Sequence, residues 1–268
     1  MADVEQQVSV WDSELDWSQG GEEWSRWWGG TPALWHGALL PRIHAHVPAP
    51  TVLEIAPGFG RWTQYLKDLS ERLIVVDIAE RCIAHCRERF SADQHIEYHV
   101  NDGRSLAMVA DRSVDFAFSF DSLVHADAAA LEAYVAELAR TLAPDGVAFI
   151  HHSNLAALRL MTRLTHRVPD RVRAPLVLRG ALIDIGAWRA EDMSAERFAQ
   201  AAERAGLSCF SQELIAWQHG RWLTDTLSFV TPAGSRWARP RRVIRSPRFG
   251  REAQRMARLY AAGATRPV

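Results

Sequence analysis

Apolar residues follow two alternating patterns along the middle of the chain. Short apolar runs, typical of buried strands, alternate with longer stretches in which apolar residues return every three or four positions, as on one helix face. The runs that predict strands are Thr51–Ile55, Leu73–Asp77, Ile96–Asn101, Val114–Phe120 and Val147–His152. Strands that alternate with helices at this spacing predict a parallel, doubly wound α/β sheet.

The pattern changes after residue 190. A helical stretch at Ser194–Ala205 precedes two apolar runs, Ser208–Trp217 and Thr224–Thr231, which have no helix between them. Two successive strands of this kind predict an antiparallel hairpin, which we place at the edge of the sheet. The segment 155–190, before these elements, is expected to be an insertion into the α/β domain.

The first 50 residues contain six of the eleven tryptophans. Trp24, Trp27, Trp28 and Trp35 recur at helical spacing, which predicts a helical cap packed on the main domain through these rings. The expected fold class is therefore α/β, a doubly wound, mainly parallel seven-stranded sheet with an antiparallel edge hairpin and an N-terminal helical cap. The expected divisions are a Trp-rich cap at residues 1–50, an α/β domain at 51–232 and an Arg-rich tail at 233–268.

Composition narrows the class of protein. The 268 residues are 48% hydrophobic and 24% charged, an ordinary globular balance, with a net charge of −1 that offers no bulk attraction to nucleic acid or anionic lipid. No apolar run reaches the roughly 18 residues that a membrane span needs. The start of the chain lacks the basic and apolar profile of a secretory signal. We therefore expect a cytoplasmic protein with no membrane partner.

The tail between residues 233 and 268 departs from this balance, with ten arginines and one acidic residue. Such a segment could contact an anionic substrate, RNA or the acidic face of a partner. It could equally dock on the acidic remainder of its own chain. We favour docking, and so expect no nucleic-acid partner.

A glycine-containing loop follows the first predicted strand. Gly58 and Gly60 lie where the backbone must turn tightly before a helix and can approach a ligand closely. The loop lacks the Gly-Lys-Ser/Thr ending of a phosphate-binding loop. Carboxylates lie at three strand ends, Glu54, Asp77 and Asp102. Three carboxylates suit a cationic adenosyl ligand and would repel a pyrophosphate.

These features resemble the class I S-adenosylmethionine-dependent methyltransferases, over about residues 50–232. The segments that carry the resemblance are Leu53–Gly60, Asp77, Asn101–Gly103, Asp115–His125 and Leu138–Val147. One departure is Ala56-Pro57, where the family more often begins with glycine. A looser resemblance, carried by the Trp-rich start, links the chain to bacterial sugar and polysaccharide O-methyltransferases.

The resemblance implies S-adenosyl-L-methionine as the cofactor. It implies that Gly58 and Gly60 border the methionine moiety, that Asp77 holds the ribose, and that Asp102 with Gly103 frames the adenine. The expected cofactor-binding residues are Glu54, Gly58, Gly60, Asp77, Ile78, Asp102, Gly103 and Phe120.

Ligands of doubly wound sheets bind at the carboxyl ends of the strands, so acceptor-side candidates follow strands four and five. Asp121 and His125 follow the fourth strand, and His151 and His152 lie at the end of the fifth. Histidine is a suitable base for removing a hydroxyl proton near neutral pH. His125 is the first catalytic candidate and His152 the second, with Asp121 beside them.

The same side chains allow a second mechanism. Asp121, His125, Asp127 and one histidine of the pair at 151 and 152 could hold a divalent cation such as Mg²⁺, which would orient a diol and lower its pKa. The spacing is not diagnostic of a metal site. No metal ligand is assigned, and both mechanisms stay open.

The sequence gives little information about the molecule that accepts the methyl group. The Asn/Asp-Pro-Pro-aromatic signature of base-methylating enzymes is absent after strand four, which argues against amino methylation of nucleobases. We expect O-methylation of a hydroxyl on a saccharide or small secondary metabolite. The alternatives are a small-molecule N- or carboxyl-methyltransferase and a non-catalytic scaffold subunit that binds the cofactor. A homodimer is also left open.

Overall fold

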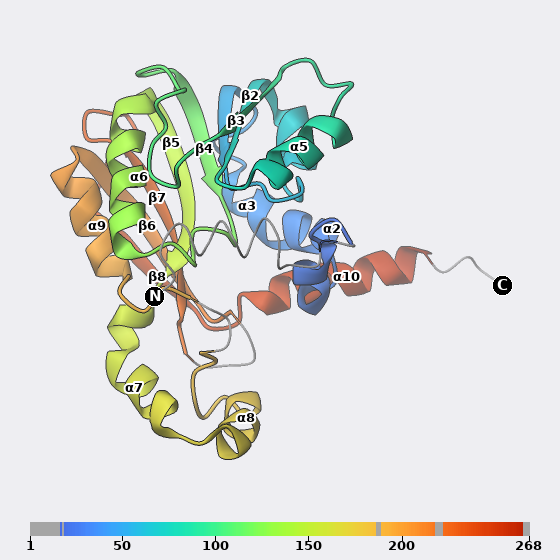
Figure 1. The fold of residues 1–268 in the computed structure, drawn as a ribbon, viewed down its shortest axis with the longest axis vertical. Coiled ribbons are helices and arrows are strands. Elements are labelled where there is room, and N and C mark those ends of the chain that lie inside the picture. Colours follow the sequence, from blue (N-terminus) through green and yellow to red (C-terminus); the bar gives the residue numbers. More distant parts are fainter. Residues whose placement is uncertain (1–16, 18, 186–188, 218–221, 265–268) are drawn as a thin grey trace.

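The computed structural model describes residues 17, 19–185, 189–217 and 222–264. Their strands form an eight-stranded sheet in the order β3-β2-β1-β4-β5-β7-β6-β8, with helices packed on both faces (Figure 1). The parallel strands are β1 (Ala49–Ile55), β2 (Ser70–Asp77), β3 (Ile96–Val100), β4 (Val114–Ser119) and β5 (Leu142–Ser153). The predicted doubly wound, mainly parallel α/β fold is confirmed.

The strand order reverses between β1 and β4. The chain runs outward from β1 through β2 to β3 and then returns to lay β4 and β5 on the other side of β1. Loops leaving the carboxyl ends of β1 and β4 must therefore diverge to opposite sides of the sheet. In open α/β sheets this divergence marks the ligand-binding crevice.

The antiparallel part of the sheet corrects one expectation. β7 (Asp225–Pro232) pairs with β5 and with β6 (Leu207–Ile215), as the hairpin predicts, but β8 (Arg242–Ser246) adds outside β6 in parallel. The sheet thus has eight strands rather than seven, and the hairpin is not its edge. β8 was missed because four of its five residues are exposed, so no buried face leaves an apolar pattern.

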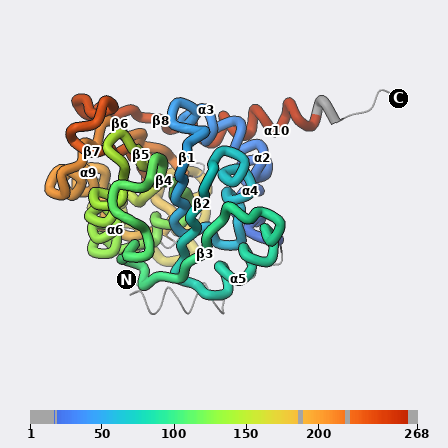
Figure 2. The backbone as a smooth tube through the Cα atoms, turned by 90° about the horizontal axis from the view of Figure 1, so that it is seen from above, coloured from blue at the N-terminus to red at the C-terminus, as the bar shows by residue number. Residues whose placement is uncertain are grey.

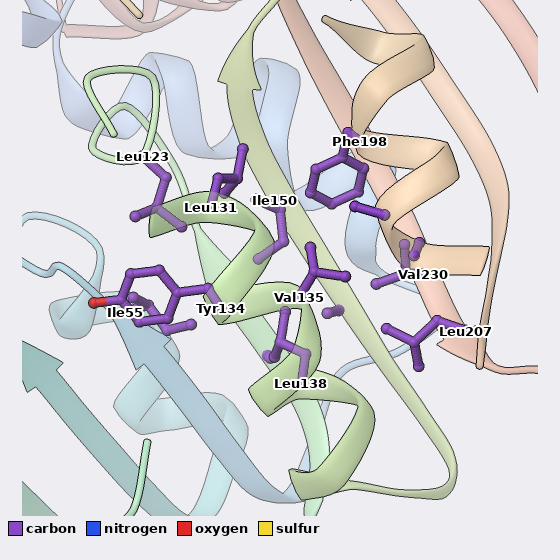
Figure 3. Packing of buried hydrophobic residues seen from close by; sticks show 14 of the residues in the cluster. Ile55, Leu123, Leu131, Tyr134, Val135, Leu138, Ile150, Phe198, Leu207 and Val230 are labelled. Atoms are coloured by element: carbon purple, nitrogen blue, oxygen red, sulfur yellow. The ribbon is translucent and has the colours of Figure 1, made fainter. Parts of the chain in front are cut away.

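One face of the sheet is covered by α6 (Ala128–Thr141) and α9 (Ala195–Arg204). Leu131, Val135 and Leu138 of α6 lie against Ile150 of β5, while Phe198 of α9 reaches the same core (Figure 3). The apolar residues of α6 recur every three or four positions, which directs them all toward the strands. α5 (Glu80–Arg89) lies on the opposite face, where it buries Ile83 and Cys86 in the same cluster as the residues of the N-terminal cap.

The opposite face carries the N-terminal cap. The cap consists of the 3₁₀ helix η2 (Glu22–Trp28), α2 (Thr31–Leu34), the π-helical turn η3 (Trp35–Leu39) and α3 (Leu40–Ile43). Trp35 is buried, stacks on Tyr65 and meets Phe118 of β4 edge-on. Trp27, in contrast, is 68% exposed, so helical spacing did not place every ring in the core. α4 (Thr63–Leu66) and η4 (Lys67–Leu69) follow the glycine loop on this side.

Residues 155–178 form an arm. η5 (Leu155–Leu158), α7 (Arg159–Arg167) and α8 (Asp170–Leu178) leave the end of β5 and extend away from the body of the sheet (Figure 1). Leu160, Leu164 and Leu178 are exposed on it. Within the described part of the chain, no helix is both long and apolar enough to cross a membrane.

The C-terminal segment packs on the cap and buries one phenylalanine there. After β8, α10 (Gly250–Ala264) packs on the cap, and Phe249 at its start is fully buried between Trp28 and Phe120. A Cβ on Gly250 would lie 1.7 Å from the Trp28 ring, so only glycine fits there. Arg42 of α3 links the cap to the C-terminal segment by forming ion pairs with Glu213 of β6 at 2.7 Å and with Glu252 of α10 at 2.6 Å.

Truncation of Phe249 should therefore cost much of the stability of the fold. Phe249→Ala removes a fully buried ring, and such changes cost about 3–5 kcal/mol. The measurement is urea unfolding followed by circular dichroism. Leu259→Ala, at a position of α10 that is 58% exposed, is the control and should shift stability by less than about 0.5 kcal/mol. Equal stabilities of the two variants would contradict this packing.

Candidate functional site

The loop after β1 is the first part of the site. Gly58 and Gly60 have φ angles of 58° and 84°, which favour glycine, and a Cβ on Gly60 would lie 2.5 Å from the Phe90 ring. A Cβ on Gly58 would lie 2.8 Å from the ring of Trp17, which also stacks on Phe59. The two glycines therefore allow both the tight turn and close packing, and Trp17 covers the loop from the N-terminal side.

Ala56 begins this loop in the left-handed region, with a φ of 59°. This angle explains why glycine is commoner at the position, since a Cβ there costs about 1–2 kcal/mol. Ala56 is held by its backbone N–H, which donates to the Val76 carbonyl, and by its carbonyl, which accepts from the Ser122 hydroxyl at 2.8 Å. The loop after β1 is thus tied directly to the loop after β4.

Asp77, at the end of β2, lies beneath the glycine loop. Its carboxylate accepts from the N–H groups of Gly58 at 3.1 Å and Ala79 at 2.9 Å. Ile78 beside it is half-buried. The carboxylate is thereby fixed between the loop and the first turn of α5.

The turn after β3 brings the next expected residues to the same edge of the sheet. Asp102 is exposed and accepts from the N–H groups of Arg104 and Ser105, which hold the pKa of its carboxyl below the usual range. Gly103 is buried with a φ of 76°. The structure thus gathers the expected adenosyl-side residues of β1, β2 and β3 along one edge.

Glu54 lies behind the glycine loop, fully buried within β1. The Thr63 hydroxyl donates to its Oε2 at 2.6 Å, while its Oε1 has no hydrogen-bond partner. Burial, with a further contribution from Asp77, raises the pKa of Glu54 to about 8. Glu54 is therefore mainly protonated at neutral pH and adds little negative charge to the site, contrary to the charge we assigned it from the sequence.

A buried ion pair joins the loops after β1 and β4. Arg61 Nη2 lies 2.8 Å from Asp121 Oδ2, and both side chains are 8% exposed. Arg61 Nη1 also donates to the Ser25 hydroxyl of η2, so the same guanidinium holds the cap. Asp121 has a φ of 66°, a second strained position facing Ala56 across the site.

His151 of β5 stands next to this pair. The backbone N–H of Asp121 donates to its Nδ1 at 3.1 Å, and the ring stacks on Phe120 and lies beside Trp217. Burial, followed by the charge of Arg189, holds the pKa of His151 well below its usual value. The ring is neutral, and because Nδ1 accepts, we assign the proton to Nε2. That buried N–H has no hydrogen-bond partner.

A second buried ion pair lies on the other side of His151. Arg189 Nε donates to Asp225 Oδ1 at the start of β7, and its guanidinium lies 4.9 Å from the Trp217 ring centroid. The cluster Arg61, Asp121, His151, Arg189 and Asp225 therefore holds two arginines, each offset by a carboxylate. Sequence reasoning named Asp121 and His151 among the acceptor-side candidates but missed Arg61, Arg189 and Asp225.

The structure does not bring His152 to this cluster. Successive residues of a strand point to opposite faces, and His152 points with Ile150 toward α9, where it stacks on Phe198. Its Nε2 lies 2.8 Å from the Ser228 hydroxyl and its Nδ1 2.9 Å from the Ser153 carbonyl. Burial lowers its pKa to about 4. Strand alternation in β5, where His151 shares the face of Phe149, was the available signal.

The remaining acceptor-side candidates lie in the loop before α6. His125 is half-buried, and its charge contributes to the lowered pKa of His151, which places the two rings in the same neighbourhood. Asp127 caps α6 by accepting from the Ala130 N–H at 2.8 Å. Phe120, expected at the cofactor, instead buries its ring against Trp62 and Phe249.

The donor set for a divalent cation is not assembled. Among the described residues, no group of three or more His, Cys, Asp and Glu side chains is arranged to hold a metal ion. Asp121 is engaged by Arg61 and Asp127 by the N-terminus of α6, so two of the expected ligands have other partners. The residues present do not fit the metal alternative.

Comparisons with known proteins show what the chain is similar to. Residues 52–146 match a family model described as a methyltransferase domain. Nodulation protein S of Sinorhizobium fredii is 30% identical over 112 residues, a match that covers 41% of this chain and 51% of that protein. The chain therefore spans about half the length of this curated relative.

Two solved structures show the same fold. The DhpI–SAH complex is 18% identical, covers 86% of this chain and 97% of that chain, and has a TM-score of 0.56. The PH0226 protein from Pyrococcus horikoshii OT3 is 20% identical, covers 84% and 95%, and has a TM-score of 0.51. At these identities the two structures establish the architecture of the sheet and its helices.

The raised pKa of Glu54 makes stability depend on pH. Between its ordinary value of 4.5 and about 8, the folded state keeps the proton that the unfolded state loses. Stability therefore falls as pH rises through this window, by up to about 1.4 kcal/mol per pH unit for one proton. Glu54→Gln should lose less stability than wild type between pH 5 and pH 8 in urea unfolding. Parallel curves would contradict the assignment.

The Arg61–Asp121 pair should show strong coupling. Arg61→Met leaves a buried carboxylate without its partner and should cost about 3–5 kcal/mol of unfolding free energy. Adding Asp121→Asn removes that charge, so the double variant should recover part of the loss, with a coupling of about 1–3 kcal/mol. Urea unfolding of the wild type, both single variants and the double variant measures it. Additive effects would mean that the pair does not join the loops.

Proposed function

We propose that the chain is a class I S-adenosylmethionine-dependent methyltransferase, as the match of residues 52–146 to a methyltransferase domain supports, and that it methylates a hydroxyl oxygen of a saccharide or small secondary metabolite. The observation that carries the proposal is the direct contact between the loops after β1 and β4. The Ser122 hydroxyl bonds the Ala56 carbonyl, and Arg61 pairs with Asp121. A ligand on the glycine loop therefore lies next to the segment that bears His125.

Bound S-adenosyl-L-methionine would supply a methyl group on a sulfonium that is already a good leaving group. Methyl transfer is an in-line displacement, so the protein must place the oxygen opposite the sulfur and accept its proton. Gly58, Gly60 and Asp77 would hold the cofactor on the adenosyl side. The acceptor would occupy the side lined by the Arg61 and Arg189 ion pairs.

His125 is the side chain we propose as the base. His152 faces the other side of the sheet with both ring nitrogens engaged. His151 carries its proton on Nε2, and its Nδ1 accepts a hydrogen bond from the backbone N–H of Asp121. The ring therefore has no free lone pair that could take the proton of the substrate hydroxyl. Half-buried His125, in the loop between Asp121 and α6, is the remaining candidate of the three.

His151 would instead position the acceptor. Its unpartnered Nε2–H can donate to an oxygen with a lone pair, such as a second hydroxyl or an ether oxygen, but cannot bind an ammonium group. Each nearby arginine is offset by a carboxylate, which makes the surroundings suitable for an uncharged, polyhydroxylated molecule. This chemistry supports a sugar-like acceptor and an O-methylation.

The first test is release of S-adenosylhomocysteine with a panel of saccharides, phenols, amines and carboxylic acids, with and without EDTA. We expect turnover with a hydroxylated acceptor and no effect of EDTA. Turnover confined to amines or carboxylates would reject O-methylation. Tight cofactor binding without turnover across the panel would favour a scaffold subunit.

With the acceptor found, His125→Ala should lower kcat by about 10²–10⁴, the usual contribution of a positioned base, while cofactor affinity stays unchanged. The pH–rate profile of the wild type should show an ionisation that the variant lacks. His152→Gln is the matched control, because it alters a neighbouring histidine on the opposite face of β5 and should keep wild-type kcat. Wild-type turnover by His125→Ala would contradict the assignment.

A further inference from the structure

The C-terminal arginines fall into two groups. Arg241 pairs with Glu196 at 2.7 Å, Arg236 lies 3.7 Å from Asp145, and Arg239 stacks over the Phe210 ring. These three dock on the chain itself, as expected from the sequence. Six others are exposed and have no ion pair with any described residue: Arg242, Arg245, Arg248, Arg251, Arg255 and Arg258.

These six arginines lie on two consecutive elements, which we call the basic strip, residues 242–258. Arg242 and Arg245 are three apart in β8 and point to opposite faces of this edge strand. β8 and α10 follow one another along one side of the molecule (Figure 2). Arg251, Arg255 and Arg258 recur at helical spacing on the face of α10 opposite buried Ala253. Five strand residues at about 3.3 Å and nine helix residues at about 1.5 Å give the strip a length on the order of 30 Å.

The strip holds one acid, and that acid is already engaged. Glu252 lies 2.6 Å from Arg42, which belongs to the cap and also binds Glu213. Burial disfavours the charged form of Arg42, but its hydrogen bonds to Glu213 and Glu252 keep its pKa above the usual value. Both carboxylates therefore remain paired with Arg42. The positive charge of the six arginines is therefore left for a partner outside the described chain.

An exposed aromatic ring lies beside the strip. Trp27 is 68% exposed and joined to α10 by a bond from Gln254 Nε2 to its carbonyl. Tyr260 is on the other face of α10, against His36 of the cap. The exposed apolar residues of the strip, Val243, Ile244 and nearby Leu259, lie on different elements and make no single apolar face for a lipid surface. Exposed positive charge with an aromatic ring beside it matches how single strands are held, by phosphate contacts and base stacking.

We propose that the basic strip binds single-stranded RNA or DNA. Arginines of α10 and β8 contact phosphates, and the exposed ring of Trp27 offers a face on which a base stacks. The net charge of −1 gave no sign of this surface, because acidic residues elsewhere in the chain balance the arginines in number without pairing with them. The surface is separate from the acceptor cluster and does not depend on the nature of the methyl acceptor.

The probe is a fluorescein-labelled 20-nucleotide RNA without secondary structure, titrated with the full chain and followed by anisotropy from 50 to 300 mM KCl. Each neutralised phosphate of a single strand contributes a slope of about −0.7 to the plot of log K against log salt, so six arginines predict a slope down to about −4. Arg251→Gln/Arg255→Gln/Arg258→Gln should weaken binding at 50 mM KCl at least about 10-fold and reduce the slope by about 2.

The matched control is Arg163→Gln/Arg167→Gln/Arg171→Gln, which removes the same charge from exposed positions of α7 and α8 and should leave RNA affinity within about 2-fold. Trp27→Leu should weaken RNA binding but not binding of dextran sulfate. The proposal is overturned if both triple variants lose affinity equally, if dextran sulfate binds as tightly as RNA with no effect of Trp27→Leu, or if only phosphatidylglycerol vesicles bind. Circular dichroism confirms that each variant is folded.

Discussion

The buried Arg61–Asp121 ion pair connects the parts of the molecule on which the site depends. Arg61 leaves the glycine loop after β1, Asp121 begins the loop after β4, and Ser25 brings the N-terminal cap to the same guanidinium. β1 and β4 pair as far as Glu54 and Phe118, but the loops that follow them diverge at the switch point of the sheet. A charge pair shielded from water connects these loops, and removing either partner would leave an uncompensated charge in the interior.

Strain and buried polarity concentrate around this pair. Ala56 and Asp121, both with left-handed backbones, face each other where the loops meet, and His151 keeps an unpartnered N–H in the aromatic layer beside them. A sequence selected for stability alone would place glycine at position 56 and an apolar side chain at 151. Such costs are typical of binding and catalytic sites, where geometry is preserved against local preference.

Sequence patterns predicted the sheet well, because five buried parallel strands leave apolar runs and helices leave a clear period. They also located Gly58, Gly60, Asp77 and Asp102, which follow strand ends and therefore meet at one edge. β8 could not be predicted in this way, since an exposed edge strand has no apolar face.

The acceptor side was harder to predict, because Arg189 and Asp225 come from distant segments and meet through tertiary packing alone. The choice between His151 and His152 could have been made from strand alternation, since His151 shares its face with Phe149 and His152 with Ile150. The raised pKa of Glu54 could not be predicted from the sequence, because it results from burial of the side chain in the folded protein.

The central claim is that cofactor and acceptor meet between the loops after β1 and β4. A crystal structure of the full chain with S-adenosylhomocysteine tests it most directly. The account predicts ribose hydroxyls on the Asp77 carboxylate, adenine beside Asp102 and Gly103, and the sulfur atom facing the segment from Asp121 to His125. A ligand bound elsewhere, or one whose sulfur faces away from that segment, would contradict it.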